Sequence, residues 1–167
     1  MPSNYLPTID RKEVETAYSG ANYDLVYDLL VQPLHAELYK RQNFEFIDEL
    51  SPGQQLLLAY DYLRTQVGQG GFIQFIQNGY VGLLPSLIEQ LMMVQANDMA
   101  QILDDVLKVY VLNIDQLGKQ TTVEEFAKLY DEFKEFELLD SRYAEHNLPT
   151  ERKMLDYAAR NLNDFLV

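Results

Sequence analysis

The sequence predicts an all-α fold, a single compact multi-helix domain that spans residues 1–167. Apolar residues recur at helical spacing almost throughout the chain. Helix-start signals precede several of these stretches, and no β-like run is paired with a hairpin signal. The 167 residues are 47% hydrophobic and include 8 Phe and 12 Tyr, so the chain can bury a substantial core.

Two helices are expected near the N-terminus. The first covers residues 10–18 and ends at Gly20. Asn22 carries a typical N-cap side chain and precedes a second helix that runs to about residue 39. Pro33 lies inside this second helix and has no N–H to donate, so we expect a kink or a break there.

The clearest helix start is Ser51-Pro52-Gly53-Gln54. Serine at the cap, proline at the first helical position and glutamine at the third form a capping box. The following residues place an apolar face at helical spacing, formed by Leu56, Tyr60, Leu63 and Val67. We expect this helix to end at Gly68, because the three glycines at 68, 70 and 71 cost backbone entropy inside a helix.

The middle of the chain predicts three shorter helices. Residues 72–78 form the first, with Gly79 as a left-handed C-cap. Pro85 opens the second. Its apolar stripe consists of Leu84, Leu87, Ile88, Leu91 and Met92. The third begins at Asn97 or Asp98, and its apolar face is formed by Ile102, Leu103, Val106 and Tyr110.

Two longer helices are expected in the C-terminal part. Thr122-Val123-Glu124-Glu125 is a second capping box. It starts a long helix whose inward-facing residues are Phe126, Tyr130, Phe133, Phe136 and Tyr143. A last helix is expected over residues 149–165, with an apolar face formed by Met154, Leu155, Ala158, Leu162 and Phe165.

Residues that would carry catalysis or bind a metal are scarce. The chain has no Cys, so thiolate catalysis and Cys-based zinc sites are excluded. Its only histidines, His35 and His146, have no metal-binding spacing, and its carboxylates form neither a calcium loop nor a di-iron pattern. Gly68-Gln69-Gly70-Gly71 lacks the Lys-Ser/Thr and the preceding strand of a phosphate-binding loop. We therefore expect no enzyme activity, no metal and no cofactor.

The charge of the chain points to a basic partner. The net charge is −13, and residues 42–107 carry eight acidic residues against one basic residue, a net charge of −7. Such a surface repels nucleic acid and anionic membranes and attracts cations. No apolar run approaches the ~20 residues of a membrane span, and the N-terminus lacks a signal-peptide pattern. We expect a cytoplasmic protein that binds neither nucleic acid nor membrane directly.

Acidic residues at helical spacing can imitate the charge of DNA. Carboxylates four residues apart on a helix are separated by about 6 Å of rise, which is comparable with the phosphate spacing along a DNA strand. The candidate partner-binding residues are Glu45, Asp48, Glu49, Asp98, Asp104 and Asp105. A third acidic segment, diluted by Lys128 and Lys134, contains Glu124, Glu125, Asp131, Glu132, Glu135 and Glu137. The simplest interpretation of each segment taken alone is an ordinary solvated helix face.

A glycine-rich motif suggests a family. It consists of Gly70, Gly71, Phe72, Gln74, Phe75 and Asn78. With the Ser51 helix before it and the acidic-aromatic helix after it, residues 45–165 resemble the bacterial DNA-mimic protein family, whose domain has no known function in most members. The usual pattern is Asn-Gly-Gly-Phe, then Gln, an aromatic pair and Asn. Here Gln69 stands at the first Asn and Ile76 at the second aromatic position.

The resemblance implies an all-helical, non-enzymatic and dimeric protein. A characterised member displays surface carboxylates like DNA phosphates and binds a DNA-binding transcription regulator. The motif residues carry over by position and are expected to fix the fold, whereas the mimicking acids lie outside the motif. We therefore expect a non-enzymatic, acidic protein-interaction module, a DNA mimic that occupies the DNA-binding surface of a basic regulator.

Two alternatives remain open at this point. The 70–78 turn can belong to a small-ligand-binding or enzymatic domain, with Gln74, Asn78 and Tyr80 as polar contacts. This alternative predicts a pocket at the turn with a strongly perturbed titratable group. Otherwise the chain is a structural or regulatory dimer whose acidity serves only solubility, which predicts acids scattered evenly over the surface.

Overall fold

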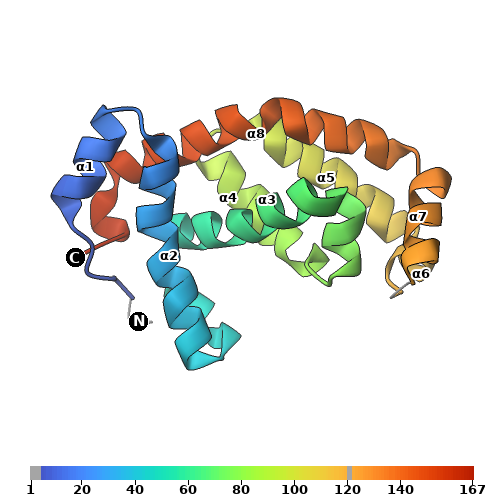
Figure 1. Ribbon diagram of the computed structural model, residues 1–167, viewed down its shortest axis with the longest axis horizontal. Coiled ribbons are helices and arrows are strands. Elements are labelled where there is room, and N and C mark those ends of the chain that lie inside the picture. The colour runs from blue at the N-terminus through green and yellow to red at the C-terminus, as the bar shows by residue number, and fades with distance from the viewer. Residues whose placement is uncertain (1–4, 120–121) are drawn as a thin grey trace. The chain divides into compact units, whose positions relative to one another are not determined.

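The computed structural model describes residues 5–119 and 122–167 (Figure 1). The predicted all-α fold is confirmed, because every regular element in these two ranges is an α-helix or a 3-10 helix and neither contains a strand. In chain order the elements are α1 Arg11–Ser19, α2 Tyr23–Arg41, η1 Phe44–Glu49, α3 Pro52–Gln77, η2 Val81–Leu83, α4 Leu84–Met93, α5 Asn97–Leu112, α6 Ile114–Leu117, α7 Val123–Glu132, α8 Glu135–Arg160 and η3 Leu162–Asp164.

Contacts between residues divide the chain into two compact units. Unit 1 comprises Met1–Ala59 and Glu151–Val167, and unit 2 comprises Tyr60–Thr150. Both boundaries fall inside helices, α3 and α8, so each unit contains part of both. The expectation of a single domain stays a prediction, and the two units are described separately below.

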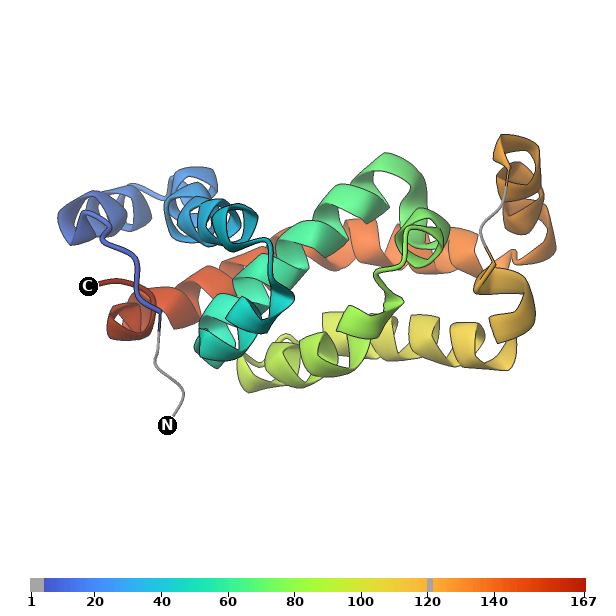
Figure 2. The same cartoon turned by 90° about the horizontal axis from the view of Figure 1, so that it is seen from below.

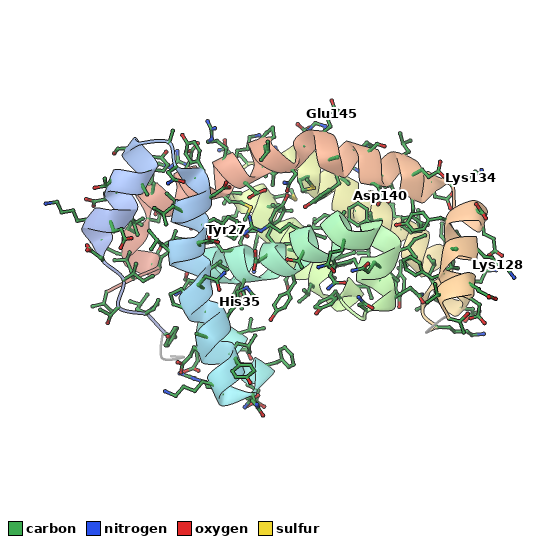
Figure 3. The ribbon with its side chains drawn as sticks, viewed as in Figure 1. Tyr27, His35, Lys128, Lys134, Asp140 and Glu145 are labelled. Atoms are coloured by element: carbon green, nitrogen blue, oxygen red, sulfur yellow. The ribbon has the colours of Figure 1, made fainter. Side chains whose placement is uncertain are left out.

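In unit 1, α1 and α2 form an antiparallel pair (Figure 1). The predicted cap at Asn22 is confirmed, since its side chain accepts from the Leu25 N–H of α2. At the start of α1 the Asp10 side chain accepts from the Lys12 and Glu13 N–H groups. The buried Tyr27 hydroxyl, labelled in Figure 3, donates to the Leu57 carbonyl at 2.8 Å and so links α2 to α3. The Tyr18 hydroxyl donates to Asp156 Oδ1 at 2.5 Å and links α1 to α8.

The capping box at Ser51 is confirmed. The Gln54 N–H donates to Ser51 Oγ at 3.2 Å, and the Ser51 N–H donates back to Gln54 Oε1 at 2.9 Å. Of the kink or break expected at Pro33, the break is wrong, because α2 continues as one helix from Tyr23 to Arg41, and the kink stays a prediction. Buried apolar residues on both sides of the proline hold the helix together, which offsets the loss of one backbone hydrogen bond.

In unit 2, α4 and α5 form a helical hairpin (Figure 2). The hairpin buries Leu84, Leu87, Leu91, Ile102, Leu103 and Val106. Met92 was expected in this apolar stripe but is 59% exposed. The predicted C-cap is confirmed at Gly79, which has φ 87° and ends the helical segment that follows Gly70 and Gly71. Within the described ranges, none of the helices combines the length and the apolar character that crossing a membrane requires.

Two predicted boundaries in the C-terminal part are wrong. The long helix that begins after Thr122 is interrupted at Phe133, whose φ/ψ of −112°/70° ends α7, and α8 begins two residues later. No glycine or proline marks this point, and Phe133 and Phe136 are buried on its two sides. Pro149 does not start a helix but lies inside α8. The hydroxyl of buried Thr150 donates to the His146 carbonyl at 2.7 Å within the same turn.

Candidate interaction surface and the glycine break

The glycine motif breaks α3 two residues later than expected. Gly68 is still helical, whereas Gly70 has φ/ψ of −151°/18° and Gly71 of 75°/−175°. The conformation of Gly71 is one that essentially only glycine adopts. A single glycine inside a helix costs only about 1 kcal/mol, so Gly68 by itself is not enough to end α3.

Two side chains from other helices bind the backbone at this break. The Tyr130 hydroxyl, from α7, lies 2.5 Å from the Gly70 carbonyl oxygen, to which it donates. The Phe72 N–H donates to Asp140 Oδ1, from α8, at 2.9 Å. Asp140 Oδ2 lies 3.2 Å from the Tyr130 hydroxyl oxygen. Three helices of unit 2 therefore meet at Gly71.

The same two side chains explain why residue 71 is glycine. A Cβ atom built on Gly71 would clash with Tyr130 Oη and Asp140 Oδ2. Tyr130 Oη cannot retreat without losing its hydrogen bond to the Gly70 carbonyl, and Asp140 Oδ2 belongs to the carboxylate whose Oδ1 accepts from the Phe72 N–H. Gly71 is buried, and its positive φ would strain any other residue even if the space were free.

The environment of the break perturbs both titratable groups. Burial, the nearby charge of Asp140 and the hydrogen bond to it raise the pKa of Tyr130 well above its ordinary value. Burial also raises the pKa of Asp140, although the hydrogen bonds from Phe72 and Tyr130 oppose this effect. Both groups are committed to the backbone of the turn, so their perturbation is accounted for without a ligand.

The remaining motif residues pack or bind within the turn. Phe72 and Phe75 are fully buried, and the Phe72 ring packs edge-on against Tyr143 with centroids 5.8 Å apart. The Gln74 amide donates to the side-chain oxygens of Gln66 and Gln69, both at 3.1 Å. The Asn78 amide donates to Gln66 Oε1 at 2.6 Å.

Asp140 is not among the predicted site residues, and Tyr130 was expected only on an apolar helix face. A signal for Asp140 was present, because it lies four residues after Phe136 and three before Tyr143, on the buried stripe of α8. A carboxylate on such a stripe needs partners. In Figure 3, Asp140 points from α8 into unit 2, whereas Glu145 on the same helix points outward.

The predicted acids of unit 1 lie on η1, a 3-10 helix rather than an α-helix. Glu45 and Asp48 are exposed and lie on the same side of η1, because it has three residues per turn. Glu49 is turned away from them and forms an ion pair with Arg41, which also pairs with Glu37 at 2.8 Å. Arg41 therefore partly neutralises the charge of Glu49.

Two of the three predicted acids of α5 also have cationic neighbours. Asp104 pairs with Lys108 at 2.9 Å, and Asp105 pairs with Arg142 of α8 at 2.8 Å. Asp105 is partly buried, which alone would raise its pKa, but its bonds to Arg142 and Gln101 prevail and lower it. Asp98 is 77% exposed and has the imidazole of His146 at 3.8 Å.

The third acidic segment differs from the other two. It contains six carboxylates on α7 and the first turn of α8, namely Glu124, Glu125, Asp131, Glu132, Glu135 and Glu137. All six residues are exposed. In residues 5–119 and 122–167, none of these carboxylates lies within 4.0 Å of a cationic nitrogen. Lys128 lies on the same side of α7 as these carboxylates and projects outward in Figure 3. We call these six residues the α7 acidic surface.

Over the described residues, no group of three or more His, Asp or Glu side chains is placed to hold a metal ion.

Unit 2 carries 14 acidic and 6 basic residues, a net charge of −8, whereas unit 1 carries 12 acidic and 7 basic residues, a net charge of −5. Unit 2, which also contains the glycine break, thus carries the larger part of the net negative charge.

The family model for DMP19-like protein matches residues 48–161. The chain belongs to the DMP19-like protein family. The match includes the glycine break, α5 and the α7 acidic surface, and it confirms the family that the motif indicated. DMP19 stands for DNA mimic protein 19. No curated protein matches the chain.

Membership of the DMP19-like family indicates a DNA mimic. A DNA mimic binds a DNA-binding protein at the surface that would otherwise hold DNA, and it needs no catalytic centre. The family match therefore favours the interaction module over the enzymatic alternative. It does not by itself say which acids of this chain contact the partner.

Proposed function

We propose that this DMP19-like chain is a non-enzymatic DNA mimic that occupies the DNA-binding surface of a basic transcription regulator. The observation that carries the proposal is the α7 acidic surface within the matched region, whose exposed carboxylates have no cationic nitrogen within 4.0 Å among the described residues. A carboxylate that is not held in an ion pair keeps more of its charge for a partner, although Lys128 on the same helix dilutes it. One that is already paired must give up that neighbour or share it.

The α7 acidic surface is expected to dominate the contact. Glu124 and Asp131 lie two turns apart on α7, about 10 Å along its axis, so they present charge at regular intervals like a phosphate strand. Asp98, Asp104 and Asp105 of α5 stay proposed partner contacts, as do the three acids of η1. Their pairing with cations predicts a smaller contribution from Asp104, Asp105 and Glu49.

The partner is identified by capture and competition. DNA-binding proteins from the host, retained on a duplex-DNA column and eluted with salt, are passed over the immobilised chain. We expect one basic protein to bind, to elute at moderate salt and to be displaced by its own duplex DNA. Electrostatic binding should weaken steeply with salt, because the screening length falls from about 10 Å at 0.1 M to about 3 Å at 1 M. Binding that DNA does not displace would contradict mimicry.

A matched pair of variants tests where the partner binds. One variant combines Glu124→Gln, Asp131→Asn and Glu132→Gln on α7. The control removes the same number of exposed charges from unit 1, through Glu15→Gln, Asp24→Asn and Asp28→Asn. Both variants have the same net charge, so only the position of the lost charge differs. Equal loss of binding in the two variants would indicate non-specific attraction and overturn the proposal.

We further propose, on the resemblance alone, that the protein acts as a homodimer, and the cytoplasmic location stays an expectation from the sequence. Light scattering at the concentration used for capture measures its mass against the 19.4 kDa of one chain. A monomer at that concentration would overturn the dimer and leave the mimicry proposal unaffected.

A further inference from the structure

The proposed function leaves the glycine motif without a role, although it is the most distinctive feature of the sequence. We propose that Tyr130 and Asp140 are positioning residues, which hold α7 in the glycine break and so set the orientation of the α7 acidic surface toward its partner. This inference rests on the proposed function for its biological meaning. The anchor itself can be tested without a partner.

The geometry of the break supports an anchor. The Gly70 carbonyl and the Phe72 N–H flank Gly71, where the backbone leaves the helical conformation. Tyr130 binds the carbonyl and Asp140 binds the N–H, so both polar groups at the break receive partners from outside α3. No buried side-chain nitrogen or oxygen in the described ranges lacks a partner, so the anchor is fully satisfied.

The positions of the hydrogen atoms decide which group donates in each hydrogen bond of the anchor. The Tyr130 hydroxyl carries one hydrogen, which it donates to the Gly70 carbonyl at 2.5 Å and, over a longer contact of 3.2 Å, to Asp140 Oδ2. An asparagine at position 140 can still accept from the Phe72 N–H through its amide oxygen, while its NH₂ group donates to the Tyr130 oxygen and leaves the hydroxyl hydrogen to the Gly70 carbonyl. The Asp140→Asn variant is therefore expected to keep the anchor.

The anchor lies on the side of α7 that faces the unit. Leu129 is buried and Tyr130 is half-buried, whereas Glu124, Asp131 and Glu132 are exposed. Holding Tyr130 therefore fixes the rotation of α7 about its own axis. Because α7 is only ten residues long, it is not stable without tertiary contacts, and a change at one such contact affects the whole helix.

Hydrogen exchange of the full chain tests the anchor. The variant Tyr130→Phe removes the hydroxyl and keeps the ring. We expect the amides of α7 to exchange about fivefold faster in this variant, which corresponds to the loss of one ordinary hydrogen bond. The amides of α5 should be unchanged. Unchanged exchange in α7 would overturn the anchor.

A matched control removes another tyrosine hydroxyl from unit 2. Tyr110 of α5 is half-buried, and no side-chain hydrogen bond of its hydroxyl occurs within the described residues. The variant Tyr110→Phe should leave exchange in α7 unchanged. Faster exchange of α7 in this control would show that any loss of a hydroxyl loosens the unit, which contradicts a specific anchor.

Rescue at position 140 separates positioning from simple packing. Asp140→Asn should keep slow exchange in α7, whereas Asp140→Leu, of similar size but without a polar group, should lose it. If asparagine and leucine behave alike, hydrogen bonding at the break is not what holds α7.

Partner binding then connects the anchor to function. Host DNA-binding proteins eluted from a duplex-DNA column serve as the probe. Tyr130→Phe changes no charge, yet we expect it to reduce DNA-displaceable binding several-fold, whereas Asp140→Asn should not. Normal binding together with a loosened α7 would overturn the positioning role and leave the DNA-mimic proposal intact. If the wild-type chain captures no DNA-binding protein while exchange behaves as expected, the proposed function fails and the anchor stands.

Discussion

The acidic residues of α5 and α7 look alike in the sequence but differ in the folded protein. Asp104 and Asp105 of α5 each lie against a cation, from Lys108 and Arg142 respectively. The α7 acidic surface is not paired in this way within the described chain, and its helix is held instead by a hydroxyl that binds backbone. Acidity alone therefore does not locate a DNA-like surface, because neighbouring cations decide how much negative charge remains available to a partner.

The largest expected effect comes from Gly71→Ala, which should break the anchor of α7 while leaving α5 in place. A Cβ there clashes with Tyr130 and Asp140, and a positive φ strains alanine. We expect a loss of about 3 kcal/mol or more in the free energy of unfolding, measured by urea denaturation. The control Gly68→Ala lies in open space within α3 and should instead stabilise by about 0.5–1 kcal/mol. Equal effects of the two variants would contradict the special role of Gly71.

Neutralising the acids of α7 and of α5 in separate variants measures how much each set contributes to partner affinity. The α7 variant Glu124→Gln, Asp131→Asn and Glu132→Gln should lower affinity for the captured DNA-binding protein by about 3- to 150-fold at low salt, at about 0.2–1 kcal/mol for each exposed charge. The α5 variant Asp98→Asn, Asp104→Asn and Asp105→Asn should lower it less, because two of its charges are already paired. Isothermal titration measures both. A larger loss in the α5 variant would reverse our assignment.

The anchor should also give α7 a pH dependence that α5 lacks. Because the folded pKa of Asp140 is raised above its ordinary value of 3.8, its contribution to stability is complete below that value and is lost as the pH rises through the folded pKa. We therefore expect Asp140→Asn to gain stability relative to wild type as the pH rises from about 3 to 7. Urea denaturation across this range measures the difference. A difference that shrinks with rising pH would have the wrong sign.

The smallest effect is expected from Arg142→Gln, which removes the cation beside Asp105. The pair is about one-third exposed, so its loss should cost less than about 1 kcal/mol. The pKa of Asp105 should return toward its ordinary value, so the stability that its lowered pKa supplies above pH 3.8 is lost. If affinity for the partner rises in this variant, the pairing of Asp105 is what limits the contribution of α5.

Much of the fold could be predicted because its signals are local. A capping box, such as that of Ser51 and Gln54, needs only a few neighbouring residues, and the structure contains it as expected. The same holds for the left-handed cap at Gly79. Boundaries that depend on distant contacts were wrong, as at Phe133, where α7 ends without any local breaker.

The candidate site could be predicted only in part. The motif residues were found because three closely spaced glycines are unusual inside a helical pattern. Tyr130 and Asp140, which explain the motif, are 60 and 68 residues away from the groups that they bind, so no local pattern links them. Likewise, the cation that neutralises Asp105 comes from another helix, 37 residues along the chain.

The helical class, the family and the strong negative charge follow from composition, periodicity and a short motif, which are properties of neighbouring residues. The pairing of the carboxylates and the need for glycine at position 71 follow from the packing of the helices. Both depend on side chains that approach within hydrogen-bonding distance from separate helices, and that approach is set by how the helices pack rather than by their order in the chain.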